Sequence, residues 1–213
     1  MNQYLEELNN QQEIKHLEIE ELRKYAEINK VPIIKRDSLV LIESILKGRK
    51  VKRILEIGTA IGYFSICMAT HFKDISIDTI ERNEEMITIA KSNIKKFNLN
   101  DRINLIEGDA VELNDELFKN NKYDMIFIDA AKAQYQKFFE KYTKYLNDDG
   151  IIFTDNIIFH NLVEEDSNKL SKNLKSLVKK IDNYNHYLNT LTDFETYFIE
   201  SGDGLAITYK KHD

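Results

Sequence analysis

Short runs of β-forming residues alternate with longer stretches of helical periodicity, and this alternation limits the possible folds more than any other feature. The β-rich runs are nearly continuous in apolar residues: KRILEIG, IDTIE, INLIEGD, YDMIFIDA and GIIFTDN. The stretches between them space apolar residues as a helix does: YFSICMATHF, EEMITIAKSNIKKF, AVELNDELF and AQYQKFFEKYTKYL. Strands that are apolar on both faces and alternate with helices indicate a parallel sheet covered on both sides. We therefore expect an α/β fold.

The N-terminal part departs from this alternation. Residues 1–30 carry apolar positions at helical spacing and predict two short helices, and Pro32 ends that pattern. Asp37 and Ser38 are N-cap candidates for a further helix that ends near Gly48.

The C-terminal part also changes character. A polar helix is predicted over about 167–187, followed by two strand candidates, DFETYFIES and GLAITYKK. Residues 202–204 join these strands so closely that they predict an antiparallel hairpin at the edge of the sheet. The chain contains no linker or repeat, so we expect one domain over residues 1–213.

The composition excludes several classes of protein. The chain has 42% hydrophobic and 31% charged residues, which is typical of a soluble globular domain. No apolar run approaches the roughly 20 residues that cross a bilayer, and the N-terminus lacks the pattern of a signal peptide. We therefore expect a cytoplasmic protein with no membrane partner. Cys67 is the one cysteine, which excludes an intramolecular disulfide and a thiolate zinc site.

The net charge of -6 argues against binding nucleic acid by bulk electrostatics but leaves room for a local basic patch. Lys30, Lys35 and Arg36 flank the sequence VPII. Residues 47–53, KGRKVKR, hold five cations in seven positions and are called the basic segment below. Short basic runs of this kind are more often solvated turns than binding sites.

Acidic side chains end the successive predicted strands. In an open α/β sheet, ligands bind outside the carboxyl ends of the strands, so these acids should line one crevice. They are Glu56, Glu81, Asp109, Asp129 and Asp155.

The sequence ILEIGTAIGYFS joins the first strand to a helix through Gly58 and Gly62. Glycine allows a ligand to approach the backbone, and the helix N-terminus offers N–H groups to an anionic group. Glu81 ends the next strand about 20 residues on, where an acid can take two ribose hydroxyls. GDA ends the third strand and is placed to meet an adenine. Each acid alone is also a plausible helix cap, but three at successive strand ends favour a nucleoside site.

Asp129 and the pair Asp155 and Asn156 end the fourth and fifth strands. Two carboxylates and an amide oxygen are hard ligands suited to Mg²⁺. An isolated Asp-Asn pair is also common in turns. The Asp at the neighbouring strand end favours the metal interpretation.

The motifs together resemble the cation-dependent O-methyltransferases, the group containing catechol and caffeoyl-CoA methyltransferases. The resemblance runs from about residue 18 onward and is closest to the bacterial branch that methylates 5-hydroxyuridine in tRNA. It rests on VPI, RILEIGTAIGY, TIERNE, DRI, GDA, FIDAAKAQYQKFF, DGIIFTDN, LVEED and GDGLAI. It implies a Rossmann-like S-adenosylmethionine-dependent methyltransferase fold, N-terminal helices over about 1–47 covering the active site, and a homodimer.

The resemblance also implies roles for individual residues. Lys132 matches the catalytic lysine, and Asp129, Asp155 and Asn156 match the metal ligands, for Mg²⁺ or another divalent cation. Phe64 stands where the family usually has serine, with Ser65 after it. The implied S-adenosylmethionine positions are Ile34, Glu56, Gly58, Thr59, Phe64, Glu81, Asp109, Ala110 and Asp129.

The leading hypothesis for the substrate is 5-hydroxyuridine at the wobble position of tRNA. Its 5-hydroxyl and O4 form a vicinal pair that a divalent cation can chelate as it would a catechol. Lys35 and Arg36 are the candidate contacts to the tRNA backbone, together with Lys30 and the basic segment. Tyr135, one turn after Lys132, is a candidate to face the substrate.

Two alternatives to a tRNA substrate remain at this stage. The first is methylation of a small catechol-like molecule, which composition does not separate from the tRNA hypothesis. The second, a non-catalytic module that binds adenosylmethionine or RNA, is disfavoured by the metal ligands and Lys132.

Overall fold

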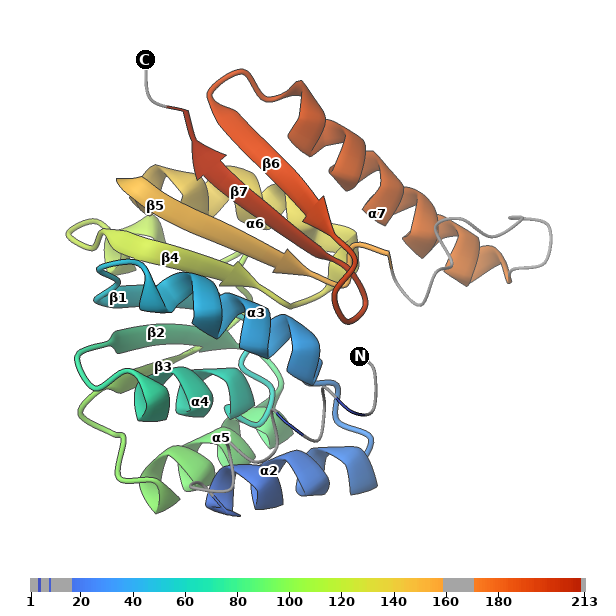
Figure 1. Ribbon diagram of the computed structural model, residues 1–213. Helices are drawn as coiled ribbons and strands as arrows, with labels where there is room; N and C mark the ends of the chain where they lie inside the picture. The colour runs from blue at the N-terminus through green and yellow to red at the C-terminus, as the bar shows by residue number, and fades with distance from the viewer. Residues whose placement is uncertain (1–3, 5–7, 9–16, 159–170, 212–213) are drawn as a thin grey trace.

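The computed structural model describes residues 4, 8, 17–158 and 171–211, in which a seven-stranded mixed sheet forms the centre (Figure 1). The strand order is β3-β2-β1-β4-β5-β7-β6. Strands β1 to β5 pair in parallel, and β7 pairs antiparallel with both β5 and β6. The strands are β1 Arg53–Ile57, β2 Ser76–Glu81, β3 Ile103–Glu107, β4 Tyr123–Ile128, β5 Leu146–Asp155, β6 Phe194–Ile199 and β7 Leu205–Lys210. The predicted parallel sheet with a C-terminal antiparallel hairpin is confirmed.

Helices cover both faces of the sheet. In Figure 1, α3 and α4 cross in front of the strands and α6 lies behind them. The helices are α2 Leu17–Ile28, α3 Arg36–Lys47, α4 Tyr63–His71, α5 Glu84–Lys96, α6 Tyr135–Tyr142 and α7 Lys172–Thr190. Short 3₁₀ turns are η2 Asp115–Leu117, η3 Lys132–Gln134 and η4 Thr143–Tyr145. None of the helices described is long and apolar enough to cross a membrane.

The continuous apolar character of the central strands follows from this sandwich. Side chains alternate between the two faces of a strand, so a strand covered on both sides must be apolar at every position. In β4, Met125 and Phe127 enter the core beneath α2, α3 and α4. Ile126 and Ile128 enter the core beneath α6 and α7.

The start of α3 differs from the prediction that Asp37 or Ser38 caps it. The N-cap is Lys35, without a capping side-chain hydrogen bond among the described residues. The carboxylate of Asp37 instead accepts hydrogen bonds from the backbone N–H of Ser38 at 3.1 Å and of Gly202 at 3.0 Å. Asp37 therefore ties α3 to the β6–β7 turn, a long-range role that local sequence does not reveal.

Two other predicted elements differ in extent. The sequence AVELNDELF was predicted to be helical but forms only η2, because Asp109 and Asn114 bond to backbone N–H groups and close turns there. Helix α7 begins at Lys172 after the N-cap Ser171 and ends at Thr190, beyond the predicted end. Residues 167–170 of that prediction, and most of 1–16, lie outside the described residues.

Candidate active site

A cavity of about 630 Å³ opens at the carboxyl ends of β1 to β4, beneath the segment that joins α2 to α3. Every position that the resemblance assigned to S-adenosylmethionine lines this one cavity, and Lys132 lines it as well. Strand ends that are far apart in sequence meet here because parallel strands present their carboxyl ends at one edge. The cavity is called the donor cavity below.

Gly58 allows the turn after β1 to press against the end of β4. Its φ is +103°, and a Cβ at this position would lie 2.2 Å from the backbone oxygen of Asp129. No side chain fits at that distance, so glycine is required for the cavity floor to form. The chain then enters α4 at Tyr63, where the helix N-terminus faces the cavity.

Glu81 is held at the rim of the donor cavity by backbone N–H groups. Its Oε2 accepts from Ala60 at 2.9 Å, and its Oε1 accepts from Arg82 and Asn83 at 2.8 Å each. These bonds fix the carboxylate without using all its lone pairs, so it can still accept hydrogen bonds from a diol.

Asp109 is also fixed, through a partner that the sequence did not single out. Its Oδ1 accepts from the backbone N–H of Val111 at 2.9 Å, and its Oδ2 lies 2.8 Å from Nη1 of Arg82. The Val111 hydrogen bond and the Arg82 guanidinium lower the pKa of Asp109, which keeps this carboxylate ionised. Arg82 lines the donor cavity, and its place directly after Glu81 could have drawn attention to it.

Glu56 forms part of the buried floor of the donor cavity. Its Oε2 accepts from the hydroxyls of Ser65 and of Thr79, the latter at 2.6 Å. Burial raises the pKa of Glu56 to about 8, against the effect of both hydrogen bonds. Ser65 is therefore directed at Glu56, and the aromatic ring of Phe64 takes the place in the cavity wall, stacked 4.1 Å from the ring of Phe127.

The three predicted metal ligands lie together at the ends of β4 and β5. The Nδ2 of Asn156 donates to Oδ1 of Asp129 and to Oδ2 of Asp155, at 3.0 Å each. Asn156 adopts φ +63°, a left-handed conformation that asparagine tolerates better than most residues. Turning its side-chain amide would direct the amide oxygen at the same point as the two carboxylates.

The donor set fits a divalent cation. Asp155 is only 2% exposed, and its Oδ1 has no hydrogen-bond partner among the described residues. A buried carboxylate oxygen without a partner is costly unless a cation or donor satisfies it. Two neighbouring carboxylates, joined by the amide oxygen of Asn156 once its side-chain amide is turned, are ligands of the kind that Mg²⁺ takes.

The pKa shifts of Asp129 and Asp155 also favour a bound cation. Burial raises the pKa of Asp129 to about 6, and burial together with the neighbouring charge of Asp129 raises the pKa of Asp155 well above its usual value. Two desolvated carboxylates side by side resist losing both protons unless a positive charge lies between them. Lys132 supplies part of that charge, because it lowers the pKa of both groups.

Side chains from α6 and α7 hold the segment that carries Asp155 and Asn156. The hydroxyl of Tyr135 donates to the backbone oxygen of Asp155 at 2.9 Å. The Nδ2 of Asn185 donates to the backbone oxygen of Ile157 at 2.9 Å. Tyr135 is only 1% exposed, so the prediction that it faces the substrate is wrong: it is a positioning residue. Asn185 could not be singled out from the sequence, because α7 lies far from Asp155 along the chain.

A second cavity of about 430 Å³ adjoins the first and is called the acceptor cavity below. It is lined by Lys30 to Arg36, by part of α2, and by Asn156 and Asp203. Asp129 and Lys132 line both cavities, so they lie where the two meet. The segment between α2 and α3 also borders both.

Of the two predicted tRNA contacts, Lys35 is exposed and Arg36 is not. The side chain of Arg36 is 7% exposed, and its Nη1 lies 3.9 Å from Oε2 of Glu20 on α2. Arg36 is therefore wrong as an exposed phosphate contact, because α2 covers its guanidinium. Lys30 and Lys35 are the exposed lysines that border the acceptor cavity.

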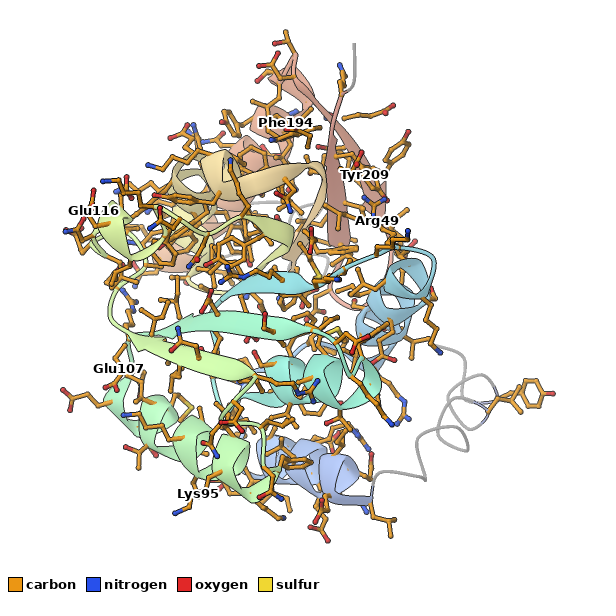
Figure 2. All side chains as sticks on the ribbon, turned by 90° about the vertical axis from the view of Figure 1, so that its left-hand side faces the viewer. Arg49, Lys95, Glu107, Glu116, Phe194 and Tyr209 are labelled. Carbon is orange, nitrogen blue, oxygen red and sulfur yellow. The ribbon has the colours of Figure 1, made fainter. Side chains whose placement is uncertain are left out.

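The basic segment leads into β1, so it lies at the amino ends of the parallel strands, opposite the two cavities. Figure 2 views the sheet from this end and shows Arg49 beside Tyr209. The guanidinium of Arg49 lies 5.6 Å from the centre of the Tyr209 ring. Arg53 forms an ion pair with Asp78 at 3.0 Å. The basic segment therefore borders neither cavity, and its contact to a tRNA backbone remains a prediction.

Comparison with known proteins agrees with this geometry. Residues 7–211 match the model of the O-methyltransferase family. A solved structure of a Staphylococcus aureus protein assigned to the caffeoyl-CoA O-methyltransferases is 44% identical, covers 98% of each chain and superposes with a TM-score of 0.92. The caffeoyl-CoA O-methyltransferase of Populus kitakamiensis is 28% identical over 204 residues, which are 90% of this chain and 86% of the relative.

The fold is shared more widely. An O-methyltransferase from Bacillus cereus, solved in complex with SAH, is 24% identical and has a TM-score of 0.77 over 91% of this chain and 90% of its own. The chain thus has the fold of the S-adenosylmethionine-dependent methyltransferases. It belongs to the O-methyltransferase family of the caffeoyl-CoA type and is an S-adenosylmethionine-dependent O-methyltransferase.

Proposed function

We propose that this enzyme methylates the 5-hydroxyl of 5-hydroxyuridine at the wobble position of tRNA to give 5-methoxyuridine, with Mg²⁺ or another divalent cation. The observation that carries the proposal is the junction of the donor and acceptor cavities at Asp129 and Lys132. A methyl donor in one cavity and an acceptor oxygen in the other would meet at that junction. Fixing two reactants at near-attack distance accounts for much of the rate in such a transfer.

In the donor cavity, the fixed carboxylate of Glu81 would accept hydrogen bonds from the ribose hydroxyls of S-adenosylmethionine. Asp109 and Ala110 border the place for the adenine. The N-terminus of α4 offers backbone N–H groups to the methionine carboxylate. Glu56 lines the same cavity, and the methionine ammonium bound beside it would favour the ionised form of this buried carboxyl group.

Asp129 and Asn156, which line the acceptor cavity, and the neighbouring Asp155 would hold the divalent cation. When bound, the cation supplies a Lewis acid that lowers the pKa of the acceptor hydroxyl and orients it by chelating two adjacent oxygens. Lys132 borders the same point and is placed to take the hydroxyl proton or to stabilise the oxygen left behind. The acceptor oxygen would then form a bond to the methyl carbon as the carbon–sulfur bond breaks, and S-adenosylhomocysteine would be the leaving group.

Two features favour a tRNA acceptor. Lys30 and Lys35 place exposed positive charge at the border of the acceptor cavity in a protein with a net charge of -6. Lysines in such a place can hold the phosphate backbone while the base enters the site. The sequence motifs also resemble most closely the bacterial enzymes that methylate 5-hydroxyuridine.

The second candidate is a small catechol-like acceptor. The relatives in Staphylococcus aureus and Populus kitakamiensis carry the name of enzymes that act on caffeoyl-CoA. A catechol presents the same vicinal oxygens as 5-hydroxyuracil, so a cation held by these ligands would bind either ring.

Competition in one reaction separates the two candidates. The purified protein is given Mg²⁺, S-adenosylmethionine, tRNA that contains 5-hydroxyuridine and an equal concentration of catechol. Mass spectrometry then measures 5-methoxyuridine and methylated catechol. We expect 5-methoxyuridine to form faster. Methylation of the catechol alone would reject the tRNA proposal and support the small-molecule candidate.

A further inference from the structure

Phe64 lines the donor cavity at the position where the family usually has serine. We propose that the face of the Phe64 ring, beside the carboxyl group of Glu56, binds the ammonium group of the methionine part of S-adenosylmethionine. The inference rests on the proposed placement of the cofactor in the donor cavity and not on the identity of the methyl acceptor. It gives a cofactor-binding role to a side chain that can form no hydrogen bond of its own.

The pairing of β1 with β4 places Glu56 beside Phe127. The two residues are in register in parallel strands, so their side chains point to the same face of the sheet. Helix α4 lies over this face (Figure 1). The hydroxyl of Ser65 on α4 donates to Oε2 of Glu56. The ring of Phe64, the residue before Ser65, stacks on the ring of Phe127 with the ring centres 4.1 Å apart. Glu56 and Phe64 are therefore neighbours in the wall of the donor cavity.

Both side chains leave one side for a ligand in the donor cavity. The hydrogen bonds that Glu56 accepts from Ser65 and Thr79 both go to its Oε2. Its Oε1 has no hydrogen-bond partner among the described residues. Phe127 covers one face of the Phe64 ring, so the rest of that ring borders the cavity. A ligand there meets a carboxyl oxygen and an aromatic surface at the same place.

A carboxyl group next to an aromatic ring suits an organic cation. The electrons of the ring attract a cation over its face, and this attraction is stronger where water is excluded. Glu56 is 1% exposed and Phe64 is 3% exposed, so an ammonium group beside them gives up most of its water. That loss is costly unless new partners replace the water. Oε1 of Glu56 would accept one N–H group of the ammonium, and the ring would lie against another.

The carboxylate of the methionine part has other partners. The hydroxyl of Ser65 does not stand in for the missing serine, because it donates to Glu56. The N-cap of α4 is Gly62, and no side chain of the described residues caps this helix end. Its backbone N–H groups are therefore available to a carboxylate. The amino-acid part of the cofactor would thus be held at both ends, with its carboxylate at α4 and its ammonium between Glu56 and Phe64.

Two ligands that differ only in the ammonium group test the inference. They are S-adenosylhomocysteine and its deaminated analogue, in which hydrogen replaces the amino group. Calorimetric titration gives the Kd of each ligand for the parent protein, for Phe64→Leu and for Phe138→Leu. Phe64→Leu removes the aromatic face and keeps a large apolar side chain. Phe138→Leu is the matched control, because Phe138 is a buried aromatic residue that lines the same cavity from α6.

The ratio of the two Kd values measures the preference for the ammonium group. We expect the parent to bind S-adenosylhomocysteine more tightly than the deaminated analogue. In Phe64→Leu we expect this preference to fall about 3- to 30-fold, the size of a desolvated cation–π contact. In Phe138→Leu we expect both Kd values to change by the same factor, which leaves the preference unchanged. A general loosening of the cavity would act on both ligands alike and so would not change the ratio.

A second variant keeps the shape of the side chain, in case Phe64→Leu does not fold. It carries pentafluorophenylalanine at position 64, whose ring no longer attracts a cation over its face, and we expect the same fall in preference.

An unchanged ratio in the variants of Phe64 would overturn the inference, because the ring would then serve packing alone. A parent protein without preference between the two ligands would overturn it as well. If the parent bound neither ligand, the placement of the cofactor in the donor cavity would be rejected, and the inference with it. Failure of the proposed tRNA substrate would appear instead in the competition reaction and would leave these Kd values as they are.

Discussion

Replacing Tyr135 with phenylalanine tests how the structure positions the metal ligands. The ring stays and keeps its contact with Tyr184, whose centre is 5.4 Å away, while the hydrogen bond to the backbone oxygen of Asp155 is lost. Loss of one buried hydrogen bond should lower the free energy of unfolding by about 1 to 2 kcal/mol. For a domain of this size the melting temperature should then fall by roughly 2 to 8 °C. Calorimetric unfolding measures both quantities.

The same variant should weaken metal binding. Partners that orient a metal ligand typically affect affinity about 10- to 100-fold, so we expect a loss in that range in a Mn²⁺ titration. Tyr142→Phe is the matched control, because its buried hydroxyl donates to the backbone oxygen of Ala110 at 2.7 Å, away from the metal ligands. It should lose similar stability and keep its Mn²⁺ affinity. Equal Mn²⁺ affinity in Tyr135→Phe and the parent would refute the positioning role.

Three further predictions concern the cofactor, the metal and the tRNA. Asp155→Ala should abolish methyl transfer and keep S-adenosylmethionine binding, whereas Glu81→Ala should weaken that binding by about 1 to 3 kcal/mol in calorimetry. Burial raises the pKa of Asp129 from 3.8 to about 6, so the metal-free protein should become less stable as the pH rises from about 4 to 6, which melting curves would record. Over the same pH range the affinity for Mn²⁺ should rise, because the metal binds the ionised carboxylate. Replacing Lys30 and Lys35 with glutamine should reduce the salt slope of tRNA binding by roughly one to two units, and replacing two lysines of the basic segment should not.

Each of these has a contradicting outcome. Equal loss of S-adenosylmethionine affinity in Asp155→Ala would place that residue in the donor cavity. Stability that rises with pH over this window would mean that the folded protein lowers the pKa of Asp129. An unchanged salt slope in the double lysine variant would locate the tRNA surface elsewhere.

The sheet and the position of the site could be predicted because they depend on local patterns. A strand that is apolar on both faces, such as 123–128, can be recognised from its sequence alone. The polar residue that follows it must then lie at the carboxyl ends of the parallel strands. Glu56, Glu81 and Asp129 were therefore predicted to share one crevice, and they line one cavity. The same rule places the basic segment away from the two cavities, because it precedes β1 and so lies at the amino ends of the parallel strands.

The errors concern features that depend on tertiary packing. Arg36 looked like a surface cation, but α2 covers it, and no local pattern reports that contact. Tyr135 has a hydroxyl that looked available to a substrate, yet its partner is the backbone of Asp155. Asp203 was predicted only as part of the hairpin turn, and its place in the lining of the acceptor cavity depends on how the hairpin meets β5.

The most direct test of the central claim is nucleoside analysis of tRNA from cells that lack this protein. The account predicts that 5-methoxyuridine disappears and 5-hydroxyuridine accumulates in its place. Expression of the parent chain should restore 5-methoxyuridine, and expression of the Asp155→Ala variant should not. Unchanged 5-methoxyuridine in tRNA from the deletion strain would contradict the assignment of tRNA as the substrate.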